Sequence, residues 1–284
     1  TLLSNLRIPT ALVFTPTNLE SEKKKFFSSD TYNPVFEYRI VKNNNAEILK
    51  KLSKVKEIGD IDPRISDFYI QLIDSKREAN DLMYAVGNNE SITDISVHRY
   101  GKPNEQLFRN AARVLRGKMD SYNVVKHSSV KNDDILCHDE IVKVFNTTFQ
   151  ELGLDGWSVN ESINSTKNGV KIGIKRKEVL VSPNIERSRF KLRKTLVHEV
   201  GTHALRAHNG LKCGIPALSN ANLPDYLDIE EGLATWNEHN LGLLSNKWFR
   251  NKAALAWAIY IGENMSFRQL YNCLLGALQK SDAF

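Results

Sequence analysis

The sequence predicts an α+β protein that is mostly helical and has a small mixed β-sheet beside one long helix. Three observations support this prediction. Apolar residues recur at helical spacing through most of the N-terminal half. Two short runs with strand character, 170–174 and 178–181, follow one another in the middle of the chain. A helical pattern then runs from Ser188 to about Ala207 and stops at Asn209-Gly210, a typical helix end.

Helices are expected to dominate the chain before residue 153. Residues 1–45 look irregular, apart from a short strand candidate at 38–41. The Asn88-Asn89 region and Gly101-Lys102-Pro103 interrupt the helical pattern. The periodicity of apolar residues places helices at 46–58, 65–86, 106–115 and 140–152.

After residue 153 the expected order is a small sheet followed by helices. A loop rich in Pro, Asn and Gly spans 211–228. We therefore expect a mainly helical part, 1–150, that packs on a core formed by 151–284, unless both belong to one continuous domain. Beyond the elements named above, the pattern predicts a strand at 157–159 and helices at 229–244, 248–262 and 267–279.

Composition excludes several classes of protein. Of the 284 residues, 41% are hydrophobic and 25% are charged, the balance of a soluble globular chain. No apolar run approaches the roughly 20 residues that span a bilayer, and the opening segment lacks the pattern of a signal peptide. The three cysteines form no CxxC pair, which argues against a disulfide framework. A reducing, cytoplasmic location is expected.

Positive charge is concentrated in one stretch. Residues 171–194 hold nine Lys or Arg against two Glu, a larger surplus than the net +6 of the whole chain. Such a run is either a solvated face of a strand and a helix or an electrostatic platform for an acidic partner. No aromatic residues alternate with the charges and no nucleic-acid module is recognisable, so nucleic acid is not an expected partner.

The string His198-Glu199-Val200-Gly201-Thr202-His203 has the pattern HExxxH. Each residue of a regular helix advances by about 100°, so residues five apart lie about 140° apart and cannot share a metal ion. One π-helical turn absorbs the additional residue and returns both imidazoles to one face. Gly201 lies inside the interval, where glycine gives the backbone freedom to adjust. The spacing therefore predicts a π-bulge.

A catalytic zinc ion takes three protein ligands, so a third must come from elsewhere. The pair Glu230-Glu231, before Gly-Leu-Ala, offers that ligand. One of the two acids could instead complement the dipole of the helix that it enters. Glu199, beside the first histidine, is the natural general base. His208, at the end of the same helix, is expected to be exposed.

HEVGTH followed by EEGLA resembles the microtubule-associated tyrosine carboxypeptidase family and its bacterial relatives, which carry a QEGLA-type motif. The segments 32–38 and 100–103 also look like landmarks of this family. The resemblance covers most of the chain and is strongest between Trp157 and Leu233. It implies a gluzincin-type zinc peptidase core within 151–284, which removes the C-terminal tyrosine from acidic α-tubulin tails.

Carried over residue by residue, the resemblance makes His198, His203 and Glu231 the Zn²⁺ ligands and Glu199 the catalytic acid and base. Glu231 is preferred because it directly precedes Gly-Leu-Ala. The chain has Glu230 where the bacterial relatives have Gln, so Glu230 remains an alternative.

A carboxypeptidase also needs a cation for the terminal carboxylate of its substrate and a donor for the oxyanion. Candidates for the cation are Arg193, Arg206 and Lys212, each of which could equally be an ordinary surface residue. Tyr226 and Tyr260 are candidate oxyanion donors, with Tyr260 preferred as catalytic, although aromatic residues at helical spacing are more often core.

The metal motif alone does not decide how a peptide is cut. An endopeptidase, a dipeptidyl peptidase and a non-catalytic zinc-binding protein are the alternatives to a carboxypeptidase. The intact Glu199 argues against the last of these, because a structural zinc site has no use for a base beside its ligand.

Overall fold

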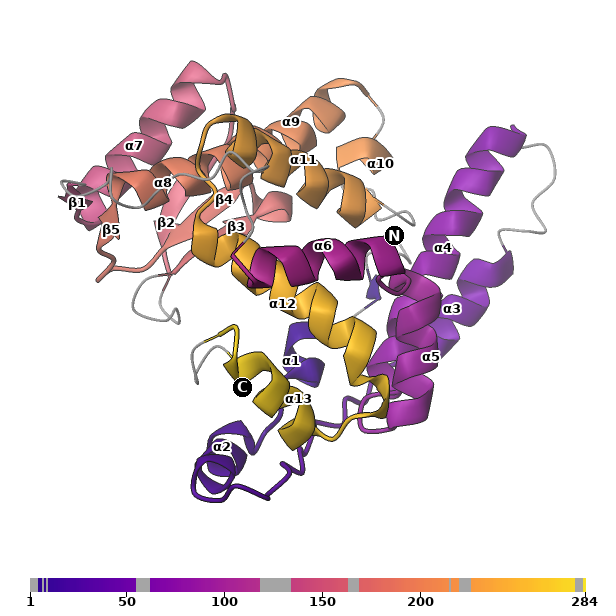
Figure 1. Ribbon diagram of the computed structural model, residues 1–284. Helices are drawn as coiled ribbons and strands as arrows, with labels where there is room; N and C mark the ends of the chain where they lie inside the picture. The colour runs from indigo at the N-terminus through magenta and orange to yellow at the C-terminus, as the bar shows by residue number, and fades with distance from the viewer. Residues whose placement is uncertain are drawn as a thin grey trace. The chain divides into compact units, whose positions relative to one another are not determined.

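The computed structural model describes residues 5, 6, 8, 10–54, 62–117, 134–162, 169–214, 216–219, 226–278 and 283–284. It is mostly helical with two small sheets, which confirms the predicted fold class (Figure 1). Contacts divide the chain into two compact units. Unit 1 combines Thr1–Ser121 with Lys247–Phe284, and unit 2 is the continuous stretch Tyr122–Asn246 between them.

Unit 1 is built from helices. Asp62, Asn88 and Asn104 cap three of them, each accepting a hydrogen bond from a backbone N–H of the first turn. α3 packs on α4, and α4 on α5. The elements are α1 (Thr10–Phe14), α2 (Leu19–Phe27), α3 (Asn45–Ser53), α4 (Pro63–Tyr84), α5 (Asn89–Tyr100), α6 (Glu105–Leu115), α12 (Asn246–Ile261), η6 (Gly262–Asn264) and α13 (Phe267–Leu275).

Two features of unit 1 differ from the sequence-based expectation. The strand expected at 38–41 is wrong: the segment has no regular secondary structure, no described strand pairs with it, and Ile40 is 90% exposed. α5 was not expected because it buries none of its residues and therefore lacks an apolar stripe. The helices expected from 65, 106, 248 and 267 are confirmed, whereas the end of the one expected at 46–58 lies outside the described residues.

Part of the core of unit 1 joins both ends of the chain. Phe26 is fully buried, with its ring edge-on to those of Phe267, Tyr271 and Phe284 at centroid distances of 4.7–5.4 Å. The guanidinium of Arg268 lies 3.3 Å from the centroid of the Phe26 ring. The unit therefore depends on residues from the start and the end of the sequence.

Unit 2 holds both sheets. In the larger sheet the strand order is β2-β4-β3, with β2 parallel and β3 antiparallel to β4, so the predicted mixed sheet is confirmed. The elements are β1 (Ile135–Leu136), α7 (His138–Glu151), β2 (Ser158–Glu161), β3 (Val170–Gly173), η4 (Ile174–Arg176), β4 (Glu178–Val181), β5 (Arg187–Ser188), α8 (Arg189–Thr195), η5 (Leu196–Ala204), α9 (Leu205–Lys212), α10 (Pro216–Ser219) and α11 (Tyr226–Asn240).

The sheet of unit 2 packs against the helix that carries the HExxxH motif. Val179 and Val181 of β4 are fully buried in one apolar cluster with Val200 and Ala204 of η5 and with Phe145 of α7. The apolar positions of the motif helix therefore fix one of its faces on the sheet. None of the described helices combines the length and apolar character that a membrane span requires.

Candidate metal centre

The HExxxH motif lies on one continuous helical segment formed by α8, η5 and α9. Ser188 begins this segment by accepting a hydrogen bond from the backbone N–H of Lys191. η5 is a π-helix that spans both histidines, which confirms the predicted bulge. The hydroxyl of Thr202 donates to the carbonyl of Val197, five residues earlier, and accepts from the side-chain amide of Asn237 on α11. These bonds tie the wide turn to the neighbouring helix.

α11 packs along η5 and brings Glu231 to the two histidines. The Glu231 carboxylate lies 3.3 Å from Nε2 of His198 and 3.5 Å from Nε2 of His203. One potential ligand atom from each of the three residues lies within 4.8 Å of the other two, close enough for one metal ion. Among the described residues this is the only group of His, Cys, Asp and Glu that meets this test.

Glu230 takes a different position from Glu231. Its Oε1 lies 3.0 Å from Nδ1 of His203, on the far side of that imidazole from Nε2. Glu230 also accepts from Nε of Arg206 at 2.9 Å and from the hydroxyl of Tyr226. Burial alone would raise the pKa of Glu230, but these hydrogen bonds hold it below its ordinary value. Glu230 is thus placed to orient His203, while Glu231 faces the shared centre.

A second buried acid, Glu238, holds His198. The Nδ1 atom of His198 donates to Oε1 of Glu238 at 2.8 Å, and Nζ of Lys194 lies 3.2 Å from the other oxygen of that carboxylate. Glu238 is only 2% exposed. Its hydrogen bond raises the pKa of His198, which burial would otherwise lower. Each histidine therefore pairs Nδ1 with a buried carboxylate and turns Nε2 toward Glu231, the arrangement typical of metal-binding imidazoles.

Glu199 projects from the same π-helical turn. It is partly buried, and burial raises the pKa of its carboxyl group, while the nearby charges of His198 and His203 act in the opposite direction. The partly buried guanidinium of Arg187 lies close enough to interact with the charge of Glu199. A half-buried carboxylate with a raised pKa beside two candidate ligands is suited to accept and return a proton.

The candidate substrate residues have different surroundings. Arg193 and Lys212 are exposed at opposite ends of the motif helix. Arg206 is engaged, because besides Glu230 it donates from Nη1 to the carbonyls of Leu218 and Ser219. The Arg206 guanidinium therefore already links Glu230 to the backbone of α10.

The candidate oxyanion donors lie in different units. Tyr226, in unit 2, donates to Glu230 and lies under the Arg206 guanidinium; burial and this hydrogen bond raise its pKa. Tyr260 belongs to unit 1, where its ring stacks on that of Phe108 at 4.3 Å. The role proposed for either tyrosine from the sequence stays a prediction.

Sequence reasoning missed the orienting residues Glu238 and Lys194. A signal for Glu238 was present, since it lies seven residues after Glu231 and therefore on the same face of a helix. Lys194 similarly precedes His198 by four residues. His208 was expected to be exposed, which is wrong: it is 4% exposed on the part of the helix that packs toward the sheet.

The family model described as microtubule-associated tyrosine carboxypeptidase matches residues 24–284. The chain belongs to that family. The match spans nearly all of the sequence, so it includes unit 2 with the histidine–glutamate cluster and most of unit 1. It confirms the resemblance seen in HEVGTH and EEGLA and places the chain in a family of carboxypeptidases. A search among curated proteins finds no significant match.

Proposed function

We propose that this chain is a zinc-dependent carboxypeptidase of the cytoplasm that releases tyrosine from the acidic C-terminal tail of tubulin. The observation that carries the proposal is the convergence of His198, His203 and Glu231 beside Glu199. Membership of a tyrosine carboxypeptidase family supports the cleavage mode and the substrate.

The residues present fit a zinc ion. Two imidazoles and one carboxylate form a ligand set that catalytic zinc sites use. The buried carboxylates of Glu238 and Glu230 hold the opposite ring nitrogens and so direct both Nε2 atoms to one point. When bound there, zinc would polarise the carbonyl of the scissile peptide and lower the pKa of a coordinated water molecule.

Proton transfer falls to Glu199. In its ionised form it accepts a proton from the attacking water, and in its protonated form it donates that proton to the leaving amine. A pKa raised by burial brings the carboxyl closer to the pH at which both steps are efficient. The released amino acid carries away the new amine, and the shortened tail keeps the new carboxylate.

Recognition of the terminal carboxylate needs a cation that has a free donor. Of the three candidates, Arg193 and Lys212 are exposed and Arg206 already binds Glu230 and two carbonyls. We therefore assign to Arg206 the task of positioning Glu230, which in turn orients His203. Arg193 and Lys212 remain the candidates for binding the substrate carboxylate. Tyr260 is kept as the candidate oxyanion donor and Tyr226 as its alternative.

The test compares the wild type with Glu199→Gln on an acidic peptide that ends in tyrosine. Glutamine keeps the shape of the side chain but cannot take the proton. We expect one zinc ion per chain in both proteins, measured by atomic emission, and release of free tyrosine by the wild type alone, measured by mass spectrometry. The expected loss of kcat is at least about 100-fold, the usual contribution of a general base.

The same peptide with an amidated C-terminus is the control for cleavage mode. A carboxypeptidase should leave it intact, because the carboxylate that it recognises is gone. Internal fragments from either peptide would establish an endopeptidase, and removal of two residues at a time would establish a dipeptidyl peptidase. Full activity of the Glu199→Gln protein would contradict the assignment of the base.

A further inference from the structure

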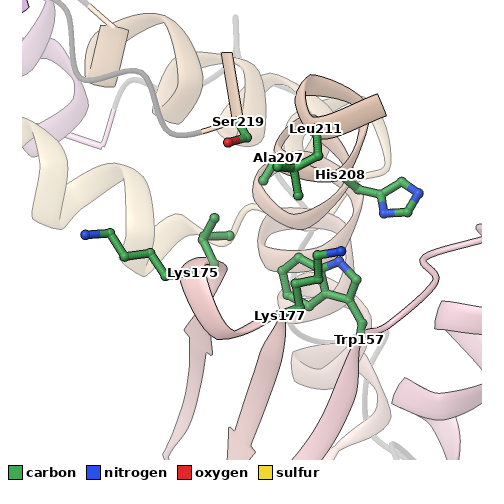
Figure 2. Close-up of a pocket in the computed structure, with 8 residues that line it drawn as sticks. Trp157, Lys175, Lys177, Ala207, His208, Leu211 and Ser219 are labelled. Atoms are coloured by element: carbon green, nitrogen blue, oxygen red, sulfur yellow. The ribbon is translucent and has the colours of Figure 1, made fainter. Parts of the chain in front are cut away.

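A cavity in unit 2 lies on the side of the motif helix that meets the sheet. It has a volume of about 310 Å³ and is lined by Trp157, by the turn after β3 with Lys175 and Lys177, and by Ala207, His208 and Leu211 of α9 (Figure 2). None of the four residues proposed for zinc binding and proton transfer lines it. The cavity is therefore separate from the candidate metal centre, although one continuous helix contributes to both.

Buried polar atoms in this cavity have no hydrogen-bond partner. His208 is 4% exposed, and neither of its ring nitrogens is bonded to any described residue. The indole Nε1 of Trp157, a residue 9% exposed, is also unbonded within the described part of the chain. Buried polar groups are normally hydrogen-bonded, because leaving them unpaired costs free energy. A ligand in the cavity would supply the missing partners.

The charge of the cavity favours an anion. Lys175 and Lys177 line it, and no acidic side chain is among the lining residues. Burial lowers the pKa of His208, and the positive charges of Lys212 and Lys177 lower it further, against the opposing charge of Asp155. His208 is therefore a neutral imidazole near pH 7 and offers one N–H donor. The Lys177 ammonium group and two neutral N–H groups are thus available to one ligand, whereas the Lys175 side chain extends away from these groups (Figure 2).

Lys177 occupies a backbone conformation that is costly for lysine. With φ at 51° and ψ at 51° it lies in the left-handed region, and among the described residues it is the only non-glycine with a positive φ. Asparagine or glycine would adopt this turn with less strain. The presence of lysine at a strained turn beside a cavity is consistent with a binding role for its ammonium group.

The other walls of the cavity are apolar except for Ser219 of α10 (Figure 2). Ala207, Leu211, the side chain of Ile174 and the indole ring of Trp157 offer contact to a short hydrocarbon stem. The volume is at the lower end for ligand sites, so the occupant is small. Phosphate sites are commonly built from Arg or from the N-terminus of a helix, and neither is among the lining residues. A carboxylate on a short stem matches this wall better than a phosphate group does.

We propose that this cavity binds a carboxylate carried on a short apolar stem, held by Lys177 and the N–H groups of Trp157 and His208, with Lys175 adding positive charge at the rim. The glutamate side chain of a peptide and a free small dicarboxylic acid share this chemistry. The peptide source rests on the proposed function, since an acidic tail cut at the metal centre would place further glutamates on the same unit. The free acid does not depend on it.

The test uses the Glu199→Gln variant of the whole 284-residue chain, loaded with zinc, so that nothing is hydrolysed. Glutarate serves as the free acid and a Glu-rich peptide with an amidated C-terminus serves as the tail. Binding is followed by the NMR signal of the Trp157 indole N–H, assigned with Trp157→Phe. We expect each probe that binds to shift this signal and to bind at least tenfold more weakly to Lys177→Asn. Asparagine tolerates the left-handed turn, so this variant should fold.

Lys171→Asn is the matched control, because it removes the same charge from an exposed position on β3 of the same sheet. Lys171→Asn should bind the probes as tightly as the parent protein does.

A response to glutarate establishes a site for free acids, and a response to the peptide alone establishes a site for the tail. The proposal is overturned if neither probe shifts the indole signal, if Lys171→Asn weakens binding as much as Lys177→Asn, or if inorganic phosphate binds as tightly as glutarate. Hydrolysis is not measured in this experiment. The binding result can therefore be interpreted even if the proposed peptidase activity is absent.

Discussion

Each imidazole of the candidate metal centre is oriented through its Nδ1 atom. His198 is held by Glu238 and His203 by Glu230, and both acids are buried. A carboxylate at Nδ1 fixes the proton there and leaves the lone pair of Nε2 free for a metal ion. The protein therefore holds both rings in a binding-competent orientation before any ion arrives.

Glu238→Gln should weaken zinc binding about 10- to 100-fold, because an amide orients and polarises His198 less well than a carboxylate does. The affinity can be measured by competition with a chelator. Glu151→Gln, which changes an exposed residue at the end of α7, is the control and should bind zinc normally. Equal affinities in the two variants would mean that Glu238 serves only to pair with Lys194.

Glu22 makes unit 1 sensitive to acid. It accepts hydrogen bonds from Lys25 at 2.7 Å, from the Tyr32 hydroxyl at 2.5 Å and from the backbone N–H of Val35 at 2.9 Å. These bonds, led by that of Lys25, lower the pKa of Glu22 from 4.5 to about 2. A depressed pKa adds stability above pH 4.5 that is lost as the pH falls toward 2.

Glu22→Gln should therefore unfold more easily in denaturant at pH 7 and should lose less of its remaining stability between pH 5 and about 2 than the wild type loses. Denaturant titrations at a series of pH values measure this. Glu20→Gln, an exposed change on the same helix, should reproduce the wild-type dependence. If Glu22→Gln also follows the wild-type curve, the three hydrogen bonds do not determine acid stability.

The candidate ligands and the candidate base can be proposed from the sequence because they form a local pattern. His198, Glu199 and His203 lie within six residues, and Glu231 directly precedes Gly-Leu-Ala. Glu238 could not be assigned in the same way, since its role depends on how α11 packs on η5. The place of His208 beside Asn209-Gly210 predicts exposure, whereas the residue is buried on the part of the helix that packs toward the sheet.

Among the elements, the π-helix was predictable and the packing of α10 was not. The π turn follows from a spacing of five residues between two ligands, which a regular helix cannot accommodate. Gly201, expected to ease that turn, has no positive φ, and a Cβ there would lie 3.6 Å from the carbonyl oxygen of Leu196, an ordinary contact. The glycine that packing demands is Gly210, where a Cβ would lie 2.6 Å from the carbonyl oxygen of Leu218 on α10.

Gly210→Ala should destabilise unit 2 by about 1–3 kcal/mol, because the backbone of α10 must move to admit one methyl group. Gly201→Ala, on the same continuous helix, should leave stability unchanged or raise it by up to about 1 kcal/mol. Chemical denaturation of the two proteins, followed by circular dichroism, gives the comparison. The packing argument fails if both substitutions have the same effect.

At the scale of the whole molecule, Arg268 joins the two chain ends within unit 1. Its Nη2 atom donates to the carbonyls of Phe26 and Ser29 at 2.6 Å each and to that of Tyr32, and its backbone N–H donates to Asn33. The segment 32–38, noted in the sequence as a family landmark, is thus held by a residue 235 positions from Asn33 and 236 from Tyr32. Local periodicity gives no information on such a pairing, so this part of the fold could not be predicted.

Arg268→Lys should destabilise unit 1 by about 1.5–3 kcal/mol, since one ammonium group cannot replace the fork of a guanidinium across several carbonyls. Zinc affinity should not change, because the cluster lies in unit 2. Hydrogen exchange resolved by peptide measures both units in one experiment. Arg113→Lys, at an exposed position on α6, is the control. If Arg268→Lys makes exchange faster throughout 134–246 as well, Arg268 does not stabilise unit 1 alone.

The placement of unit 2 between two stretches of unit 1 sets an order of events during synthesis. Every residue of the candidate metal centre lies in Tyr122–Asn246 and is therefore translated before Lys247–Phe284. Unit 2 then has its whole sequence available while Phe26 and its neighbours still lack the aromatic partners that come last. A nascent chain stalled near residue 246 therefore has all its candidate metal ligands while the first half of unit 1 still awaits the second.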